Sequence, residues 1–174
     1  LIMETAFLPI FAQLPKPSSD QLKAQVKSGQ MIYASAGITT AQEGATHLHD
    51  LIILQNAADA GDLFIDVVSY PFITEIDSVM SRYTTSDFGQ YKNRLKLGGI
   101  KITIDGSPQG RTAFFTSPYL TGGPEGQKNW TGEPTFSQAT ANDMLKKVYD
   151  LGLQCTFHAN GDAAIDMCIK AHEY

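Results

Sequence analysis

The sequence is poor in features that mark several classes of protein. It holds two cysteines, one tryptophan and no run of lysine or arginine residues. The 13 basic residues are outnumbered by 18 acidic ones, which gives a net charge of -5. Nucleic acids and anionic membranes recruit proteins through basic patches, so we expect neither as a partner.

The chain also lacks a segment with the length and apolarity of a membrane span. Its opening, LIMETAFLPIFAQLP, contains Glu4 and Pro9, whereas a signal peptide needs a basic start and an unbroken apolar core. The two cysteines, Cys155 and Cys168, lie in apolar stretches typical of buried reduced thiols. These features favour a cytoplasmic protein.

With 174 residues, 43% of them hydrophobic, the chain has enough apolar sequence for one domain or part of one. It starts at Leu1 without an initiator methionine and stops inside AAIDMCIKAHEY, a helical pattern with no glycine or proline to end it. We therefore expect residues 1–174 to be a fragment of a longer protein.

One pattern recurs four times: a helix-like stretch, a glycine, then a short apolar run that ends in polar residues. The four junctions are SAGITTAQEG, DAGDLFIDVVSYP, LGGIKITIDGS and DLGLQCTFHANGD. Strands alternating with helices are typical of a parallel sheet with helical crossovers. The pattern predicts an α/β fold with parallel strands near residues 38–43, 64–70, 99–105 and 153–158.

Two of these strands alternate between apolar and polar residues. In the third, Ile100, Ile102 and Ile104 share one face and Lys101, Thr103 and Asp105 share the other. In the fourth, Leu153, Cys155 and Phe157 oppose Gln154, Thr156 and His158. An open doubly wound sheet needs apolar residues on both faces, so this alternation favours a closed barrel with chemistry in its interior.

The connection at residues 107–136 is long, rich in glycine and proline, and includes Arg111 and several aromatic residues. Loops of this length are usually functional lids or disordered linkers. Its aromatic residues argue against plain disorder.

The blocks DGSPQGRTAFFTSPY after Lys101 and HANGDAAID at His158, together with ASAGITTAQEG, resemble the amidohydrolase superfamily. The chain is most similar to the branch of metal-dependent hydrolases that includes N-substituted formamide deformylase. This resemblance implies a (β/α)8 TIM barrel, of which the chain would form strands two to five with their helices.

The resemblance also implies roles for individual residues. Lys101 would become a carbamate that bridges two metal ions, and His158 would bind one of them, normally zinc. A metal-activated hydroxide would then hydrolyse C–N bonds of small amide-like substrates. Apart from the resemblance, the place of Asp105 on the same strand face as Lys101 predicts that it shapes the catalytic site, and the Arg111 guanidinium is predicted to bind a substrate carboxylate as a bidentate donor.

The family's remaining ligands, a His-x-His pair, another histidine and an aspartate, lie on strands that this chain lacks. We therefore expect one or two divalent metals in the full-length enzyme, but an inactive, metal-free fragment. Each of these residues also has a purely structural alternative. Lys101 could extend its amine to solvent at the end of the sheet, and His158 could be a core histidine bonded to the backbone. Asp105 could form an ordinary turn, and Arg111 could brace its loop.

Three other acidic or imidazole side chains have simpler explanations. His47 and His49 are two residues apart at the start of a predicted helix, where they cannot converge on one ion, so we predict that they bind no metal. Asp162 precedes the last helical pattern and is predicted to cap it.

Two other functions stay open. One is a nucleotide- or flavin-binding α/β module with a phosphate at the helix start after ITTAQEGAT, although the sequence has no G-x-G-x-x-G or Walker motif. The other is a structural half-barrel acting by self-association. Half a barrel leaves open sheet edges, so we expect a homo-oligomer.

Overall fold

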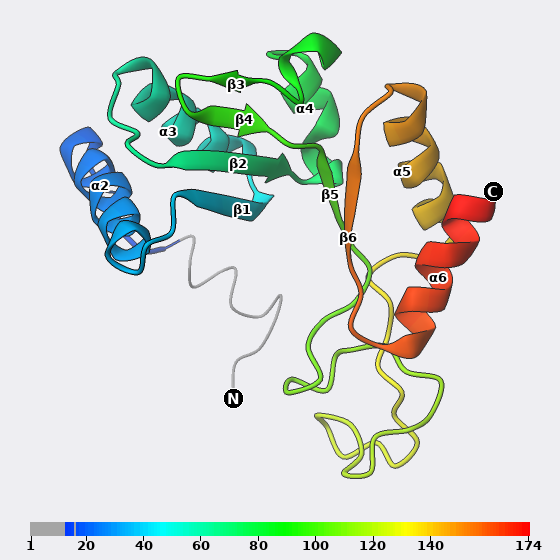
Figure 1. The fold of residues 1–174 in the computed structure, drawn as a ribbon. Coiled ribbons are helices and arrows are strands. Elements are labelled where there is room, and N and C mark those ends of the chain that lie inside the picture. The colour runs from blue at the N-terminus through cyan, green and yellow to red at the C-terminus, as the bar shows by residue number, and fades with distance from the viewer. Residues whose placement is uncertain (1–12, 16) are drawn as a thin grey trace. The chain divides into compact units, whose positions relative to one another are not determined.

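The computed structural model describes residues 13–15 and 17–174, which form a mixture of helices and strands (Figure 1). The strands are β1 (Thr40–Thr46), β2 (Asp66–Pro71), β3 (Tyr91–Lys92), β4 (Leu95–Leu97), β5 (Ile100–Thr103) and β6 (Cys155–His158). The α-helices are α2 (Ser19–Ser35), α3 (Leu48–Asp59), α4 (Ile76–Met80), α5 (Gln138–Asp150) and α6 (Asp162–Glu173). Two 3-10 helices, η2 (Ile73–Glu75) and η3 (Thr85–Asp87), complete the set.

The described residues form two compact units. The first unit contains residues 17–101 and 148–156, and the second contains residues 13–15, 102–147 and 157–174. Lys101 therefore belongs to the first unit, whereas Asp105, Arg111 and His158 belong to the second.

The first unit is built on a four-stranded sheet in the order β1-β2-β4-β3. β1 pairs in parallel with β2, and β2 pairs in parallel with β4. β2 is almost wholly buried, as expected for a central strand covered on both faces. A hydrophobic cluster joins α3 to this sheet and comprises Leu51, Ala57, Ala58, Leu63, Val67, Leu95 and Leu97.

β5 and β6 form a separate two-stranded sheet. The Ile100 N–H donates to the Gln154 carbonyl, and four residues further along both strands the Ile104 N–H donates to the His158 carbonyl. Equal advance along both strands is the register of a parallel pair. The four predicted strands are thus confirmed as β1, β2, β5 and β6.

The prediction of a purely parallel sheet is wrong at one edge, where β3 pairs antiparallel with β4. The turn between them places Asn93 and Arg94 at φ values of 51° and 68°. Two successive residues with positive φ form the tight turn whose twist suits a hairpin. Arg94 also donates from Nη1 to Asp66 Oδ1 over 3.0 Å, which fixes the turn against β2.

The predicted alternation at β5 is confirmed over residues 100–104, whereas Asp105, predicted on the polar face, is 1% exposed. Ile100, Ile102 and Ile104 are fully buried, whereas Lys101 and Thr103 are partly exposed. On β6 the predicted burial contrast is absent, because all four of its residues are partly exposed.

Helix α2 begins directly after its N-cap, Ser18. The Ser18 hydroxyl accepts from the Gln21 N–H, and the Gln21 side chain accepts from the Ser18 N–H, which completes a capping box. The helix ends before Gly37, whose φ of 77° is a left-handed conformation that glycine adopts without strain.

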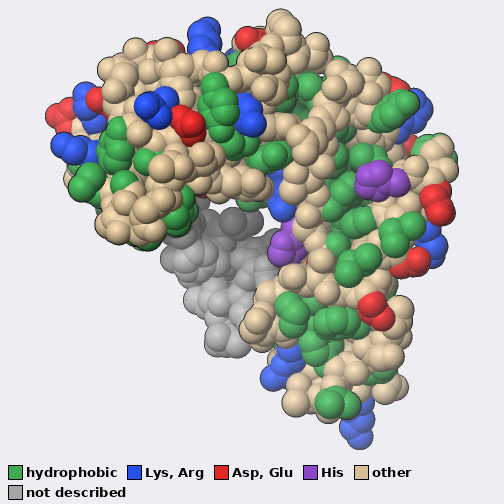
Figure 2. Space-filling model, viewed as in Figure 1, with side chains coloured by type: hydrophobic (Ala, Val, Ile, Leu, Met, Phe, Trp, Pro, Cys, Tyr) green, Lys and Arg blue, Asp and Glu red, His purple; other side chains and the backbone are tan. Residues whose placement is uncertain are grey.

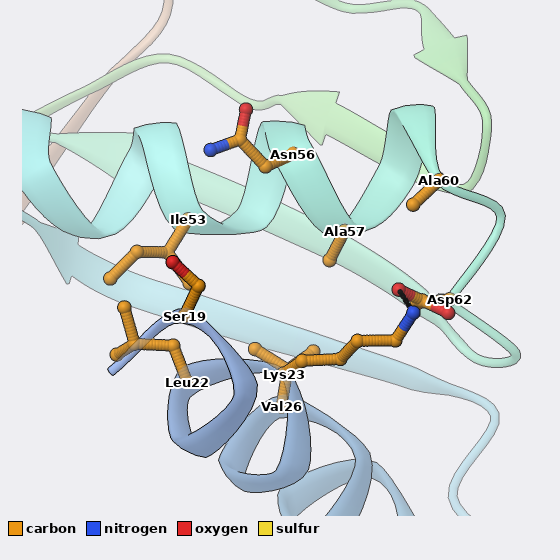
Figure 3. Close-up of a pocket in the computed structure, with 9 residues that line it drawn as sticks. All are labelled: Ser19, Leu22, Lys23, Val26, Ile53, Asn56, Ala57, Ala60 and Asp62. Carbon is orange, nitrogen blue, oxygen red and sulfur yellow. Dashed lines mark ion pairs between the residues drawn. The ribbon is translucent and has the colours of Figure 1, made fainter. Parts of the chain in front are cut away.

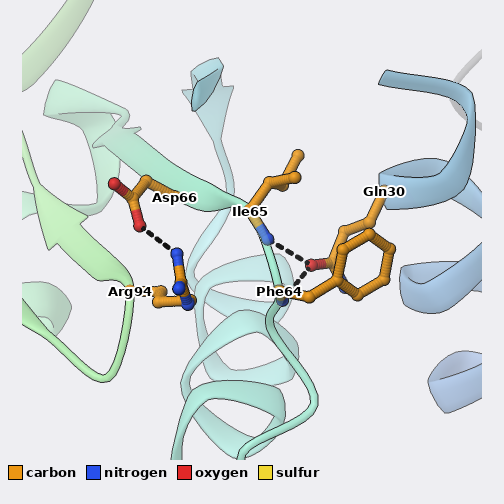
Figure 4. A network of polar contacts seen from close by, with 5 residues as sticks. All are labelled: Gln30, Phe64, Ile65, Asp66 and Arg94. Carbon is orange, nitrogen blue, oxygen red and sulfur yellow. Dashed lines mark hydrogen bonds and ion pairs between the residues drawn. The ribbon is translucent and has the colours of Figure 1, made fainter. Parts of the chain in front are cut away.

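One buried polar side chain that the sequence analysis overlooked holds α2 in place. Gln30 is 5% exposed, and its Oε1 accepts from the N–H groups of Phe64 and Ile65 (Figure 4). Its Nε2 donates to the carbonyl of Asp62 over 3.1 Å. These bonds satisfy backbone groups just before β2, and so couple helix and sheet.

We expect Gln30→Ala to lower the free energy of unfolding by about 2–3 kcal/mol, because two backbone N–H groups would lose their acceptor. Gln25→Ala on the exposed side of the same helix is the matched control and should have almost no effect. Urea denaturation followed by circular dichroism measures both. Equal effects of the two substitutions would contradict the coupling role of Gln30.

The distribution of charged side chains and the character of the helices match what the composition predicts. Acidic and basic side chains are interspersed on the face drawn in Figure 2, without a large patch of one sign. Among the described residues, no helix combines the length and apolarity needed to cross a membrane.

Candidate functional site

Lys101 lies in the middle of β5, between two fully buried isoleucines. Its backbone pairs in parallel with Phe72, which follows β2. Partial burial lowers the pKa of the Lys101 amine, and the Cys155 thiol opposes this with a smaller effect. Desolvation disfavours the ammonium form, so a larger fraction of Lys101 is the neutral amine than for an ordinary surface lysine.

His158 is the last residue of β6 and is partly exposed. Its ring Nε2 lies 2.9 Å from the side-chain nitrogen of Asn160. Lys101 and His158 belong to different units, and each is described here with its own neighbours.

Asp105 is 1% exposed and accepts three backbone hydrogen bonds. Oδ2 accepts from Phe114 and Gly161, and Oδ1 accepts from Asn160, each over 2.8 Å. These donors come from the long loop and from the turn after β6, so the carboxylate ties both to the end of β5. This anchoring accounts for a buried acid here, and the predicted catalytic role of Asp105 stays a prediction.

Arg111 braces the loop at residues 107–136. Its Nη1 donates to the carbonyls of Gly122 and Gly123 over 3.3 and 3.0 Å. Its own carbonyl accepts from the indole N–H of Trp130. Arg111 therefore braces its loop, which was the structural alternative for this residue. Binding of a substrate carboxylate by its remaining guanidinium donors stays a prediction.

The loop itself carries no helix or strand over residues 107–136, all of which are described. It is nevertheless held internally, because Phe115 donates to Thr131 and Tyr119 donates to Trp130 through their backbone N–H groups. The Tyr119 hydroxyl donates to the Ala113 carbonyl over 2.9 Å. The aromatic residues thus belong to an ordered loop, as the sequence analysis expects.

The predicted capping role of Asp162 is wrong. Gly161 is the N-cap of α6, and Asp162 is the first helical residue. Its carboxylate accepts from the hydroxyl and the backbone N–H of Thr116, over 2.5 and 2.8 Å. These bonds from Thr116 lower the pKa of Asp162 and give the loop a second attachment to α6.

Gly161 lies so close to the loop that a side chain cannot fit. A Cβ built at this position would overlap the carbonyl of Phe114. We expect Gly161→Ala to lower the free energy of unfolding by about 3 kcal/mol through this clash. Gly29→Ala is the control, since nothing lies near its added Cβ, and should stabilise α2 by about 1 kcal/mol. Thermal melts that shift equally would contradict the clash.

His47 is the N-cap of α3, which confirms its predicted place at the helix start. Its Nδ1 lies 3.0 Å from Glu75 Oε1, and its ring packs against Phe72 with centroids 4.8 Å apart. Glu75 Oε2 accepts from the Leu48 N–H. Partial burial raises the pKa of Glu75, but the hydrogen bonds from Leu48 and His47 together lower it by more. The net effect is a lowered pKa.

Among the described residues, Cys155 and Cys168 form no disulfide, and both thiols are partly exposed rather than buried as the sequence predicts. Burial raises the pKa of Cys168 to about 11, so this thiol stays protonated and unreactive at neutral pH.

A groove of about 230 Å³ lies between α2 and α3 in the first unit (Figure 3). Apolar side chains such as Leu22, Val26 and Ile53 line it, and the ion pair of Lys23 with Asp62 closes one end. None of the predicted site residues takes part in this groove.

The described residues do not present a complete donor set for a metal ion. Within the described ranges, no three His, Cys, Asp or Glu side chains gather closely enough to hold one. Lys101 and His158 are of the right chemical types, an amine that burial helps to deprotonate and an imidazole, and further ligands would have to come from elsewhere.

The sequence model of the amidohydrolase family matches residues 1–174. This chain belongs to the amidohydrolase family. The resemblance seen in the blocks around Lys101 and His158 is thereby confirmed. A Bacillus subtilis (strain 168) protein described as "Putative amidohydrolase YtcJ" is 28% identical over 79 residues, which cover 45% of this chain and 14% of that protein.

Two solved structures are similar to this amidohydrolase chain in fold. An uncharacterized metal-dependent hydrolase from Pyrococcus horikoshii OT3 matches with a TM-score of 0.79 and 24% identity, over 97% of this chain and 33% of that one. An uncharacterized metal-dependent hydrolase from Pyrococcus furiosus matches with a TM-score of 0.78 and 24% identity, over 97% of this chain and 34% of that one. The chain thus spans about a third of the length of these hydrolases.

Proposed function

We propose that the chain is part of a metal-dependent hydrolase whose catalytic domain is a (β/α)8 barrel, with this chain supplying about strands two to five. Family membership supports this proposal. So does the alternation of these strands with helices along the chain, since β1, β2 and β6 are each followed directly by a helix and β5 by the long loop and α5.

In the complete enzyme, Lys101 and His158 hold a divalent metal ion, zinc by preference. The observation that best supports this proposal is that Lys101 is half-buried and has a lowered pKa, on a strand whose other face is fully buried. A neutral amine can attack the carbon of CO2 and lose a proton, which converts a poor ligand into a carbamate with two oxygens. A bound metal supplies water activation and polarisation of the substrate carbonyl.

The substrates we propose are small molecules with amide-like C–N bonds. Asp105 and Arg111 keep the long loop ordered beside the end of β5, and the loop in turn orients the substrate. Residues that hold such a loop act on substrate affinity as well as on stability.

A phosphate-binding module is disfavoured by the start of α3. The Leu48 N–H, which a phosphate would need, already donates to the Glu75 carboxylate. A second anion at this place would be repelled by that carboxylate.

The test uses the full-length protein, stripped with a chelator and reloaded with zinc, on a panel of N-formyl and N-acyl amines. Activity that disappears on stripping and returns with zinc supports the proposal. A zinc-loaded, folded protein that cleaves none of these amides would overturn the proposed reaction. The 174-residue chain alone should be inactive because it supplies two ligands where a zinc site commonly needs three or four.

His47 and His49 provide a separate prediction. Replacing both by alanine in the full-length protein should leave the zinc content unchanged, since His47 is engaged with Glu75 and both residues lie at a helix start. Atomic absorption on the purified variant measures this. Loss of stoichiometric zinc would show that the imidazoles are ligands after all.

A further inference from the structure

The side chain of Asn160 contacts the imidazole of His158. The Asn160 side-chain nitrogen lies 2.9 Å from His158 Nε2 and 2.9 Å from the carbonyl oxygen of Gly106. The Asn160 backbone N–H donates to the buried carboxylate of Asp105 over 2.8 Å. All four residues belong to the second unit.

The Gly106 carbonyl decides which way the amide points. A carbonyl oxygen can only accept, so the group that faces it must be the NH2 of Asn160 and not its oxygen. The NH2 group has two hydrogens, one for Gly106 and one for His158. It has no acceptor capacity, so His158 Nε2 must accept, and the proton of the neutral ring must be on Nδ1.

The position of Asn160 is fixed by its neighbours. The adjacent Gly161 N–H donates to the same Asp105 carboxylate, and Gly161 is in close contact with Phe114 of the loop. Asn160 therefore cannot withdraw from His158 without a change in its side-chain torsions, which would also break the bond to Gly106.

We propose that Asn160 is a positioning residue that holds His158 in the Nδ1–H tautomer and competes with a metal ion for its lone pair. This inference rests on the proposed role of His158 as a ligand. A metal at Nε2 has to displace the Asn160 N–H. A metal at Nδ1 requires the proton to move to Nε2, which breaks the same hydrogen bond.

Asn160 therefore acts in the opposite sense to the usual partner of a ligating histidine. Such a partner accepts the N–H of the ring and strengthens metal binding. Asn160 donates instead, so it weakens binding. Loss of one such hydrogen bond corresponds to a change of about 5- to 10-fold in zinc affinity.

The first test reads the tautomer in the metal-free full-length protein. Nitrogen-15 chemical shifts of labelled histidines, recorded at a pH where the rings are neutral, should assign the proton of His158 to Nδ1. Asn160→Ala should shift His158 toward the Nε2–H form, while the exposed Asn56→Ala control leaves it unchanged. A His158 signal that does not respond to Asn160→Ala overturns the inference.

The second test measures zinc affinity in the full-length protein by competition with a chromophoric chelator. Asn160→Ala should bind zinc about 5- to 10-fold more tightly than the wild type. Asn160→Asp, which has the same size but only accepts, should also bind more tightly and serves if the alanine variant is unstable. Equal or weaker affinity in a folded variant overturns the competition.

The metal-ligand role of His158 and the positioning role of Asn160 can be disproved independently of each other. If His158→Ala leaves the zinc content unchanged, His158 is not a ligand and the proposed metal site is wrong. The tautomer measured in the metal-free protein would still report whether Asn160 donates to His158.

Discussion

Asp105→Ala is expected to lower the free energy of unfolding by about 4 kcal/mol. Three backbone N–H groups, from Phe114, Asn160 and Gly161, would lose their acceptor in a site that is 1% exposed. Each buried donor left without a partner costs about 1–3 kcal/mol. The effect should be large because the donors come from two segments, which would both detach from β5.

Asp105→Asn should have an intermediate effect, because one oxygen is kept while the new NH2 group opposes one of the backbone donors. Asp143→Ala on the exposed face of α5 is the control and should change stability by less than about 0.5 kcal/mol. Urea denaturation monitored by tryptophan fluorescence follows the loop directly through Trp130. A loss below about 1 kcal/mol for Asp105→Ala would contradict the anchoring role and favour a catalytic one.

The features that sequence could predict are those set by local patterns. The recurring junctions predict the strands observed as β1, β2, β5 and β6, and alternation in residues 100–104 identifies the buried face of β5. The blocks around Lys101 and His158 indicated the family that the comparison confirms.

The features that sequence missed depend on contacts between distant residues. Asp162 looks like a helix cap, but its partner Thr116 is 46 residues away in the sequence. The acceptor role of Asp105 involves donors 55 and 56 residues further along the chain. Local spacing cannot anticipate that the long loop donates to both acids, through Phe114 to Asp105 and through Thr116 to Asp162.

The hairpin of β3 and β4 was missed for a different reason. Its turn places Asn93 and Arg94 in left-handed conformations, whereas the sequence signal for such turns is glycine at one of these positions. The ion pair from Arg94 to Asp66 helps to hold a residue that would otherwise avoid this conformation.

Lys101→Ala in the full-length enzyme is expected to abolish hydrolysis and to remove bound zinc. The substitution deletes the amine whose lowered pKa makes a carbamate possible. Metal catalysis supplies several kcal/mol of transition-state stabilisation, so kcat/KM should fall by about 10³-fold or more. Lys101→Arg should be equally inactive, because a guanidinium keeps its charge and cannot add CO2. Lys92→Ala on the exposed edge strand β3 is the control and should keep full activity.

The most direct test of this account is the zinc content and hydrolysis rate of full-length Lys101→Ala, measured with and without bicarbonate and a short-chain carboxylic acid. We predict loss of both properties, with partial recovery when the added carboxylate occupies the place of the missing carbamate. If the variant retains zinc and hydrolyses amides at the wild-type rate, Lys101 is a structural residue and the proposed metal site is wrong.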